Sequence, residues 1–370
     1  MARFKRPISI TRSEGPFFSR QLAGETPLST ETARLLCQQA RVIWTHQPWS
    51  LVTEGCLIVV RRPEWPEAAY VSIMGMRGEH FSVCAYLGAQ GLAFFQQLQE
   101  AASVAASMDA GEFIAEMPAI YVSWENRRLL TNLDKELIES VKTRPEPGAL
   151  WPQFRASRRR YHPWYPNEQE GRMLLDCMDA VIWLWEREVP PEEEAWDTQD
   201  IYPELVRDSD DGGFDLHRAP IGKRHVPEPV PPIDESRVNR ILLAGQRPEG
   251  AIEVDRFYSM TRIGGPNDRP LTARIAMAVD QDSGYAFPPR LEPAAITDAE
   301  MLVDAVLTAM EAGSRPRRVF VRRKEYVPLL KPLGAALKFE VADLPALPAL
   351  DSAKRSMLAM MGDREPIPFR

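Results

Sequence analysis

Cysteine and histidine are scarce in this sequence, and their placement excludes several kinds of site. Its 370 residues include four cysteines, far apart and without a CxxC pair, and five histidines. A zinc knuckle or a thioredoxin-type centre needs closely spaced cysteines, so neither is present. No GxSxG nucleophile motif occurs, and no Walker lysine follows the glycines of GAQG. We therefore expect no metal and no cofactor.

Long apolar runs are also missing. No stretch approaches the roughly 18 consecutive apolar residues that a membrane-spanning helix needs. The basic N-terminus, MARFKRPISITR, lacks the apolar segment of a secretory signal. These absences predict a cytoplasmic protein with reduced cysteines and no membrane partner.

Negative charge is concentrated in one segment. The formal net charge is −7, yet residues 189–235 alone hold thirteen acidic and four basic residues. Prolines at both ends of this segment prevent helix continuation, and like charges extend a chain. The segment is predicted to be a linker, within which YPELVRD and FDLHRAPIG are candidates for short extended pieces that pack on a domain.

The length of the chain predicts two domains, because 370 residues are many for one core. Strand-like and helix-like runs are interleaved in both halves, so the predicted fold class is α+β, with each domain a mixed or antiparallel sheet covered by helices. The expected divisions are a disordered basic tail (1–27), an N-terminal domain (28–188), an acidic proline-rich linker (189–235), a C-terminal α/β domain (236–362) and a second tail (363–370).

Hydrophobic periodicity places the elements. In the N-terminal domain we expect helices at 28–47, 89–107, 132–141 and 167–187, and strands at 55–62, 69–75, 81–88, 119–127 and 150–160. In the C-terminal domain we expect strands at 251–262, 271–281, 284–293, 317–323 and 339–344, and helices at 297–313, 324–338 and 350–362. The order of the C-terminal elements is therefore βββαβαβα.

The stretch GMRGEH (75–80) joins two strand-like runs. A glycine loop that holds phosphate leads from a strand into a helix N-terminus, whereas this one leads from strand to strand. Gly75 and Gly78 supply the positive φ angles that a hairpin connection requires. We interpret the stretch as a hairpin turn; the alternative is that Glu79 and His80 project into a shared groove.

Two resemblances arise from these residues. The runs YVSIMGMRGEHFSVCAYLGAQGL and WPQFRASRRRYHPWYP resemble an uncharacterised bacterial family, whose members join such an N-terminal domain to a C-terminal α/β domain. Both domains are of unknown function, so this resemblance, which covers most of residues 28–362, implies no activity.

The βββαβαβα order is similar to the ribonuclease H-like fold of nucleases, transposases and integrases. The resemblance implies two divalent metals held between carboxylates on the first strand, near the first helix and after the fourth strand. Asp255 stands at the first position and Glu300 is a candidate for the second. The fourth strand ends in Arg322 and Arg323, where an acid is required, so we expect the catalytic site to be absent.

Two basic stretches are candidates for binding. In WPQFRASRRRYHPWYP, arginines interleave with aromatic residues, which suits stacking on bases and pairing with phosphates, although such a stretch also plugs the end of a small core. In SRPRRVFVRRK, strand alternation puts Arg318 and Arg322 on one face, and edge-strand charge that discourages aggregation is the alternative. The candidate binding residues are Arg155, Arg158, Arg159, Arg160, Tyr161, Trp164, Arg318 and Arg322.

The sequence leaves three functions open. We prefer a non-catalytic protein that binds a protein or another anionic partner through the two basic stretches. The second is a diverged ribonuclease H-like nuclease using Asp255 and Glu300, and the third is nucleic-acid binding without catalysis. Convergence of the two carboxylates with a third acid would favour the nuclease, whereas Arg322 or Arg323 in that space would disfavour it.

Overall fold

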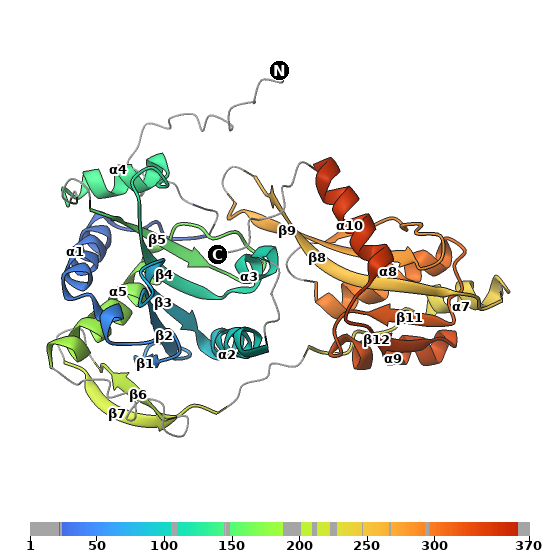
Figure 1. Cartoon of the computed structure of the whole chain (residues 1–370), viewed down its shortest axis with the longest axis horizontal. Coiled ribbons are helices and arrows are strands. Elements are labelled where there is room, and N and C mark those ends of the chain that lie inside the picture. Colours follow the sequence, from blue (N-terminus) through green and yellow to red (C-terminus); the bar gives the residue numbers. More distant parts are fainter. Residues whose placement is uncertain are drawn as a thin grey trace, which may run out of the picture.

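The computed structural model describes most of both domains. It covers residues 22, 24–104, 110–143, 145, 149–187, 201–208, 213–222, 228–245, 247–265, 268–292 and 296–361. The predicted C-terminal tail, most of the predicted N-terminal tail and residues 189–200 of the predicted linker lie outside these residues. Figure 1 shows two α+β domains side by side, as the sequence predicts.

The N-terminal domain is built on a seven-stranded mixed sheet with the order β5-β4-β3-β2-β1-β6-β7. Its elements are α1 (Thr30–His46), η2 (Pro48–Ser50), β1 (Leu57–Arg61), β2 (Ala69–Met74), β3 (Phe81–Leu87), α2 (Gly88–Val104), α3 (Ala110–Glu116), β4 (Ala119–Glu125), α4 (Asn132–Ser140), β5 (Trp151–Ser157), α5 (Glu168–Glu186), β6 (Ile201–Val206) and β7 (Asp215–Pro220). The expected helices and strands between residues 28 and 187 are confirmed, and α3 is an addition.

Local sequence explains where these helices begin. Ser29 caps α1 by accepting the Thr32 N–H at 3.1 Å, and α4 and α5 begin with complete capping boxes. Helices α1 and α5 pack on one face of the sheet, where their apolar sides join Val71, Val83 and Val122 in one core. Helix α2 covers a second core on the other face.

The stretch GMRGEH is a hairpin turn, as predicted. It joins β2 to β3, which pair antiparallel, and the Gly78 N–H donates to the Gly75 carbonyl at 2.9 Å. Both glycines have positive φ, 138° at Gly75 and 75° at Gly78. Glu79 and His80 are exposed.

Alanine substitutions in this turn should have unequal effects. A Cβ at Gly75 would lie 2.6 Å from Phe81 Cδ1 and 3.0 Å from Trp49 Cγ, whereas nothing lies within 4 Å of one at Gly78. We expect Gly75→Ala to lower the free energy of unfolding by about 3 kcal/mol, because an aromatic cluster must move, and Gly78→Ala by about 1 kcal/mol, the cost of left-handed backbone. Urea unfolding measures both; equal losses would contradict the packing argument.

The C-terminal domain has the five-stranded mixed sheet β10-β9-β8-β11-β12. Its elements are α7 (Glu235–Leu243), β8 (Ala251–Ile263), β9 (Leu271–Asp280), β10 (Arg290–Glu292), α8 (Asp298–Glu311), β11 (Arg318–Val321), α9 (Tyr326–Leu337), β12 (Glu340–Asp343) and α10 (Pro348–Met361). From β8 onward the order is βββαβαβα, as expected. The similarity to the ribonuclease H-like fold stays a prediction.

The two faces of this sheet carry different cores. Helices α7, α8 and α9 cover the face to which Ile252 and Val254 point. Helix α10 covers the opposite face with Ala251, Phe257 and Phe320. Because neighbouring residues of a strand alternate between faces, Asp255 lies on the α10 side and Arg256 on the α8 side.

Part of the predicted linker belongs to the N-terminal sheet. Strands β6 and β7 pair antiparallel, and β6 also pairs parallel with β1 through Val59 and Glu204. The two candidate extended pieces of the linker therefore form a hairpin that lengthens this sheet. No helix in the described part of the chain is both long and apolar enough to cross a bilayer.

Candidate functional site

The two domains meet through a short main-chain contact. Tyr161, after β5, and Leu271, at the start of β9, form an antiparallel bridge. The His162 N–H donates to the Pro270 carbonyl at 2.9 Å, and the Thr272 N–H donates to the Arg160 carbonyl at 3.0 Å. The arginine–aromatic stretch therefore lies at the domain boundary.

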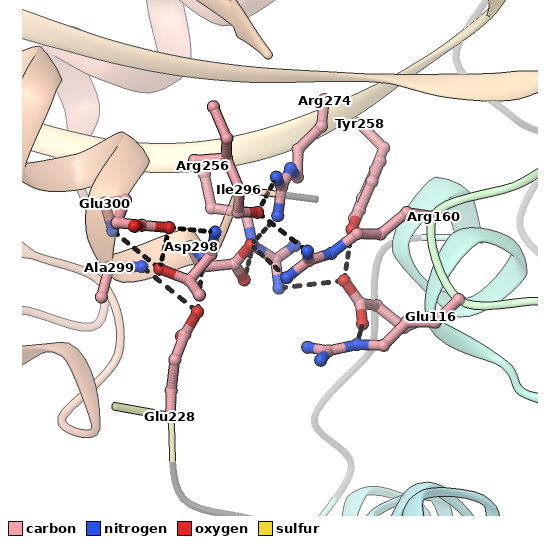
Figure 2. Close-up of polar contacts among 12 residues, drawn as sticks. Glu116, Arg160, Glu228, Arg256, Tyr258, Arg274, Ile296, Asp298, Ala299 and Glu300 are labelled. Carbon is pink, nitrogen blue, oxygen red and sulfur yellow. Dashed lines mark hydrogen bonds and ion pairs between the residues drawn. The ribbon is translucent and has the colours of Figure 1, made fainter. Parts of the chain in front are cut away.

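A buried charge cluster surrounds this bridge, centred on Asp298 at the first turn of α8. Asp298 is 2 % exposed; it accepts from Arg274 Nη1 at 2.7 Å and from Arg256 Nε, and Arg160 of the other domain lies 3.8 Å away (Figure 2). Burial opposes ionisation of this carboxyl, but the three positive charges outweigh it and hold the pKa of Asp298 well below its usual range.

Glu228 completes the α8 end of the cluster. Its carboxylate accepts the backbone N–H groups of Asp298 and Ala299, which are among the unsatisfied donors of a helix start. Burial and the neighbouring charge of Asp298 raise the pKa of Glu228.

Two acids of α3 reach the same cluster from the N-terminal domain. Glu112 accepts from Arg256 Nη2 at 2.9 Å and from Arg323. Glu116 accepts from Tyr258 (Figure 2) and from Arg159. We call this group of charged and polar residues the interdomain joint; its members are Glu112, Glu116, Arg159, Arg160, Arg256, Tyr258, Arg274, Asp298 and Arg323.

A further ion-pair group lies beside the joint. Arg269, just before β9, donates to Glu25 at 3.0 Å, to Glu170 at 3.0 Å and to the Ala156 carbonyl at 3.3 Å. Arg158 binds the same two acids at 2.9 Å and 2.8 Å. Charged groups thus bridge the domains at two places.

The structure gives internal partners to most of the predicted binding residues. Arg155 is buried and makes two hydrogen bonds to Asp134, at 2.7 and 2.8 Å, with its guanidinium 4.6 Å from the centre of the Tyr165 ring. Trp164 forms a bridge with Ala156 and packs edge-on against Tyr165. Arg158, Arg159, Arg160 and Tyr161 make the contacts described above.

The cationic strand divides between two environments. Arg322 donates to Asp255 at 2.9 Å and to Asp351 of α10. Arg318, at the other end of β11, is exposed, lies 5.3 Å from the centre of the Phe320 ring and has no ion pair within the described residues. The binding role of these arginines stays a prediction.

Asp255 and Glu300 are not brought together. Asp255 lies on the α10 side of the sheet, and burial raises its pKa despite the arginines nearby. Glu300 belongs to α8 on the opposite side, where its carboxylate accepts the Thr297 N–H at 2.7 Å and completes a capping box. Within the described residues, no group of three or more histidines, cysteines or acids could hold a metal ion.

Two of the cysteines are poor candidates for a nucleophile. Cys37 and Cys84 are buried, and burial raises the pKa of each thiol to about 12, so neither is a thiolate at neutral pH.

The start of α2 already has an acid as partner. The Ala89 N–H donates to the Glu67 carboxylate at 2.5 Å.

Sequence reasoning missed the acidic half of the joint. Glu112, Glu116 and Asp298 were not candidates, and neither were Arg256 and Arg274. Their pairing spans sequence separations of 24 and more residues, which local patterns do not report. One local signature was available, since the TDAE sequence at Thr297 is a capping box and assigns Glu300 a structural role.

Family comparisons agree with the two-domain architecture. Residues 34–200 match the model of a domain of unknown function (DUF7309), and residues 237–358 match that of a second domain of unknown function (DUF6930). No curated protein and no solved structure matches the chain. The chain therefore carries two successive segments, each of which matches the model of a domain of unknown function, and together they span most of its length.

Proposed function

We propose that this protein is a non-catalytic binding protein. The observation that carries the proposal is the Arg322–Asp255 ion pair. The Arg322 guanidinium occupies the place where a metal-dependent hydrolase would hold its metal ion between acids. Glu300 supports it, since its carboxylate is engaged at the start of α8. Asp255 and Glu300 thus have structural roles in different places.

A surface at the start of β8 fits a partner best. Backbone contacts bring several residues to this place. The Arg317 N–H donates to the Gly250 carbonyl at 3.0 Å. The Asp280 N–H donates to the Tyr285 carbonyl at 2.9 Å, and Asp280 lies opposite Ile252 of β8 in the strand register. We define the β8-start surface as Arg315, Arg317, Arg318 and Tyr285. Tyr285 is 59 % exposed, and the three arginines have no ion pair within the described residues.

The composition of this surface favours a protein over a nucleic acid. Arginine and tyrosine are the residue types that most often dominate protein–protein contacts. Two exposed acids adjoin the arginines: the Glu249 N–H donates to the Arg315 carbonyl at 2.6 Å, and Glu340 lies opposite Arg318 in the strand register. Both acids would repel a phosphate backbone. The partner is therefore a protein segment of mixed charge, with acidic residues facing the arginines and neutral or basic residues facing Glu249 and Glu340.

Charge reversal tests this function. We expect the double variant Arg317→Glu/Arg318→Glu to lose a protein that the unchanged chain captures from a lysate of its native cells. Arg41→Glu, at an exposed position on α1, is the matched control and should retain it. Mass spectrometry identifies captured proteins, and nuclease treatment reveals captured nucleic acid. Recovery of nucleic acid, of no partner, or of the same proteins by the double variant contradicts the proposal.

A further inference from the structure

The carboxyl end of β11 lies beside the middle of β8, at the point where the sheet changes direction. From β8 the chain continues to β9 and β10 on one side, and it later returns to β11 and β12 on the other. In open α/β sheets, ligands bind outside the carboxyl ends of strands at such a switch point. This end of the sheet is opposite to the β8-start surface, so the argument below does not rest on the proposed function.

Two arginines lie together at this point. β11 ends with Val321 opposite Val254, so the following register places Arg322 beside Asp255 and Arg323 beside Arg256. Arg322 is committed to Asp255 and Asp351 on the α10 side. Arg256 and Arg323 share the other side of the sheet.

Glu112 of the N-terminal domain occupies the space between these two guanidinium groups. A single oxygen, Glu112 Oε1, receives both Arg256 Nη2, at 2.9 Å, and Arg323 Nη2. Arg256 is only 4 % exposed, yet its Nη1 has no hydrogen-bond partner within the described residues. One carboxylate therefore leaves a buried donor unsatisfied, which a larger oxyanion would satisfy.

Two surrounding acids each also pair with an arginine other than Arg256 and Arg323. Asp298 pairs with Arg274 as well as with Arg256, and Glu116 pairs with Arg159. Removing the Glu112 carboxylate would thus leave excess positive charge at Arg256 and Arg323. Guanidinium groups in such an arrangement recognise phosphate through parallel hydrogen bonds.

We propose that Arg256 and Arg323 form a binding site for a phosphate-class oxyanion, and that Glu112 fills this site as an internal competitor. The ligand is inorganic phosphate or the phosphate group of a small ester. Its binding displaces Glu112 of α3 from the C-terminal domain, so ligand occupancy and the contact of Glu112 with Arg256 and Arg323 are mutually exclusive.

Phosphate titration of full-length variants tests the site. We expect Glu112→Ala to bind inorganic phosphate at least about tenfold more tightly than the unchanged chain, because the internal competitor is gone. The readout is the midpoint of thermal unfolding against phosphate concentration, with chloride holding ionic strength constant, and isothermal titration calorimetry gives the affinity. A parallel titration with adenosine monophosphate distinguishes a free phosphate from a phosphate ester.

Asp176→Ala is the matched control, because Asp176 also lies between two arginines, Arg62 at 2.8 Å and Arg207 at 3.1 Å, and is similarly buried. Glu112→Gln serves if the alanine variant does not fold. The double variant Glu112→Ala/Arg323→Gln should lose the gain. Equal phosphate responses in Glu112→Ala and Asp176→Ala, or a gain that survives Arg323→Gln, indicate adventitious binding only and overturn the proposal.

Discussion

Asp298→Asn should destabilise the protein by about 3–5 kcal/mol, because it leaves buried arginines without their shared counter-charge. Asp298 is 2 % exposed and contacts Arg256, Arg274 and Arg160 from three different strands and loops. Asparagine keeps the size of the side chain, so packing changes little. Urea unfolding of Asp298→Asn and of the unchanged chain near neutral pH measures the loss.

Asp304→Asn is the control for this substitution. Asp304 also bridges two arginines, Arg237 and Arg290, but its side chain is 24 % exposed. Solvent screening reduces the value of such a pair, so we expect a loss of no more than about 1 kcal/mol. Similar losses at Asp298 and Asp304 would show that the stability lost depends on the number of ion pairs broken and not on whether the acid is buried.

The pH dependence of unfolding separates charge from shape at this position. The pKa of Asp298 is depressed in the folded state, so its contribution is fully present above the unfolded pKa of about 3.9 and is lost as pH falls through the lower folded value. The unchanged chain should therefore lose stability below about pH 4 more steeply than Asp298→Asn does. Parallel curves for the two proteins would contradict a buried, ionised Asp298.

Most of the fold was predictable because its elements carry local signals. The helices α1 and α5 have capping residues at Ser29 and Asn167, and the β2–β3 hairpin has glycines where positive φ is needed. Helix α3 was missed because it has only seven residues, fewer than periodicity can resolve. The β6–β7 hairpin was hidden by the acidic, proline-rich composition of its surroundings, although its strand-like residues were recognised.

The site was less predictable, because its chemistry depends on partners distant in sequence. Composition drew attention to the arginines, but it does not reveal which acids they meet. Arg155 and Asp134 are 21 residues apart, and Arg323 and Glu112 are 211 apart. Two local patterns reported something useful: strand alternation separates Arg322 from Arg323 and Asp255 from Arg256, and the capping box at Thr297 assigns Glu300 a structural role.

Dense internal pairing changes what the arginine–aromatic stretch means for function. An arginine whose donors are satisfied inside the fold must break those bonds before it can bind a partner. Arg155 and Arg318 therefore represent opposite cases among the predicted binding residues, one buried and paired, the other exposed at the β8-start surface.

Arg155→Met should lower the free energy of unfolding by about 3–5 kcal/mol, because it leaves the buried carboxylate of Asp134 without its positively charged partner. That carboxylate also accepts the Thr131 N–H at 2.9 Å in the capping box of α4, so the loss extends to the start of this helix. Arg318→Met should change stability by no more than about 0.5 kcal/mol, since its guanidinium is in water. Denaturant unfolding of the two variants makes the comparison.

A double-mutant cycle decides whether the large loss comes from the pair itself. If Asp134→Asn is added to Arg155→Met, the buried charge left behind disappears, and the double variant should be less destabilised than the sum of the two single variants. Additive losses would mean that Arg155 stabilises the protein mainly through the Tyr165 ring and neighbouring side chains. Arg155 would then be a packing residue with a dispensable charge.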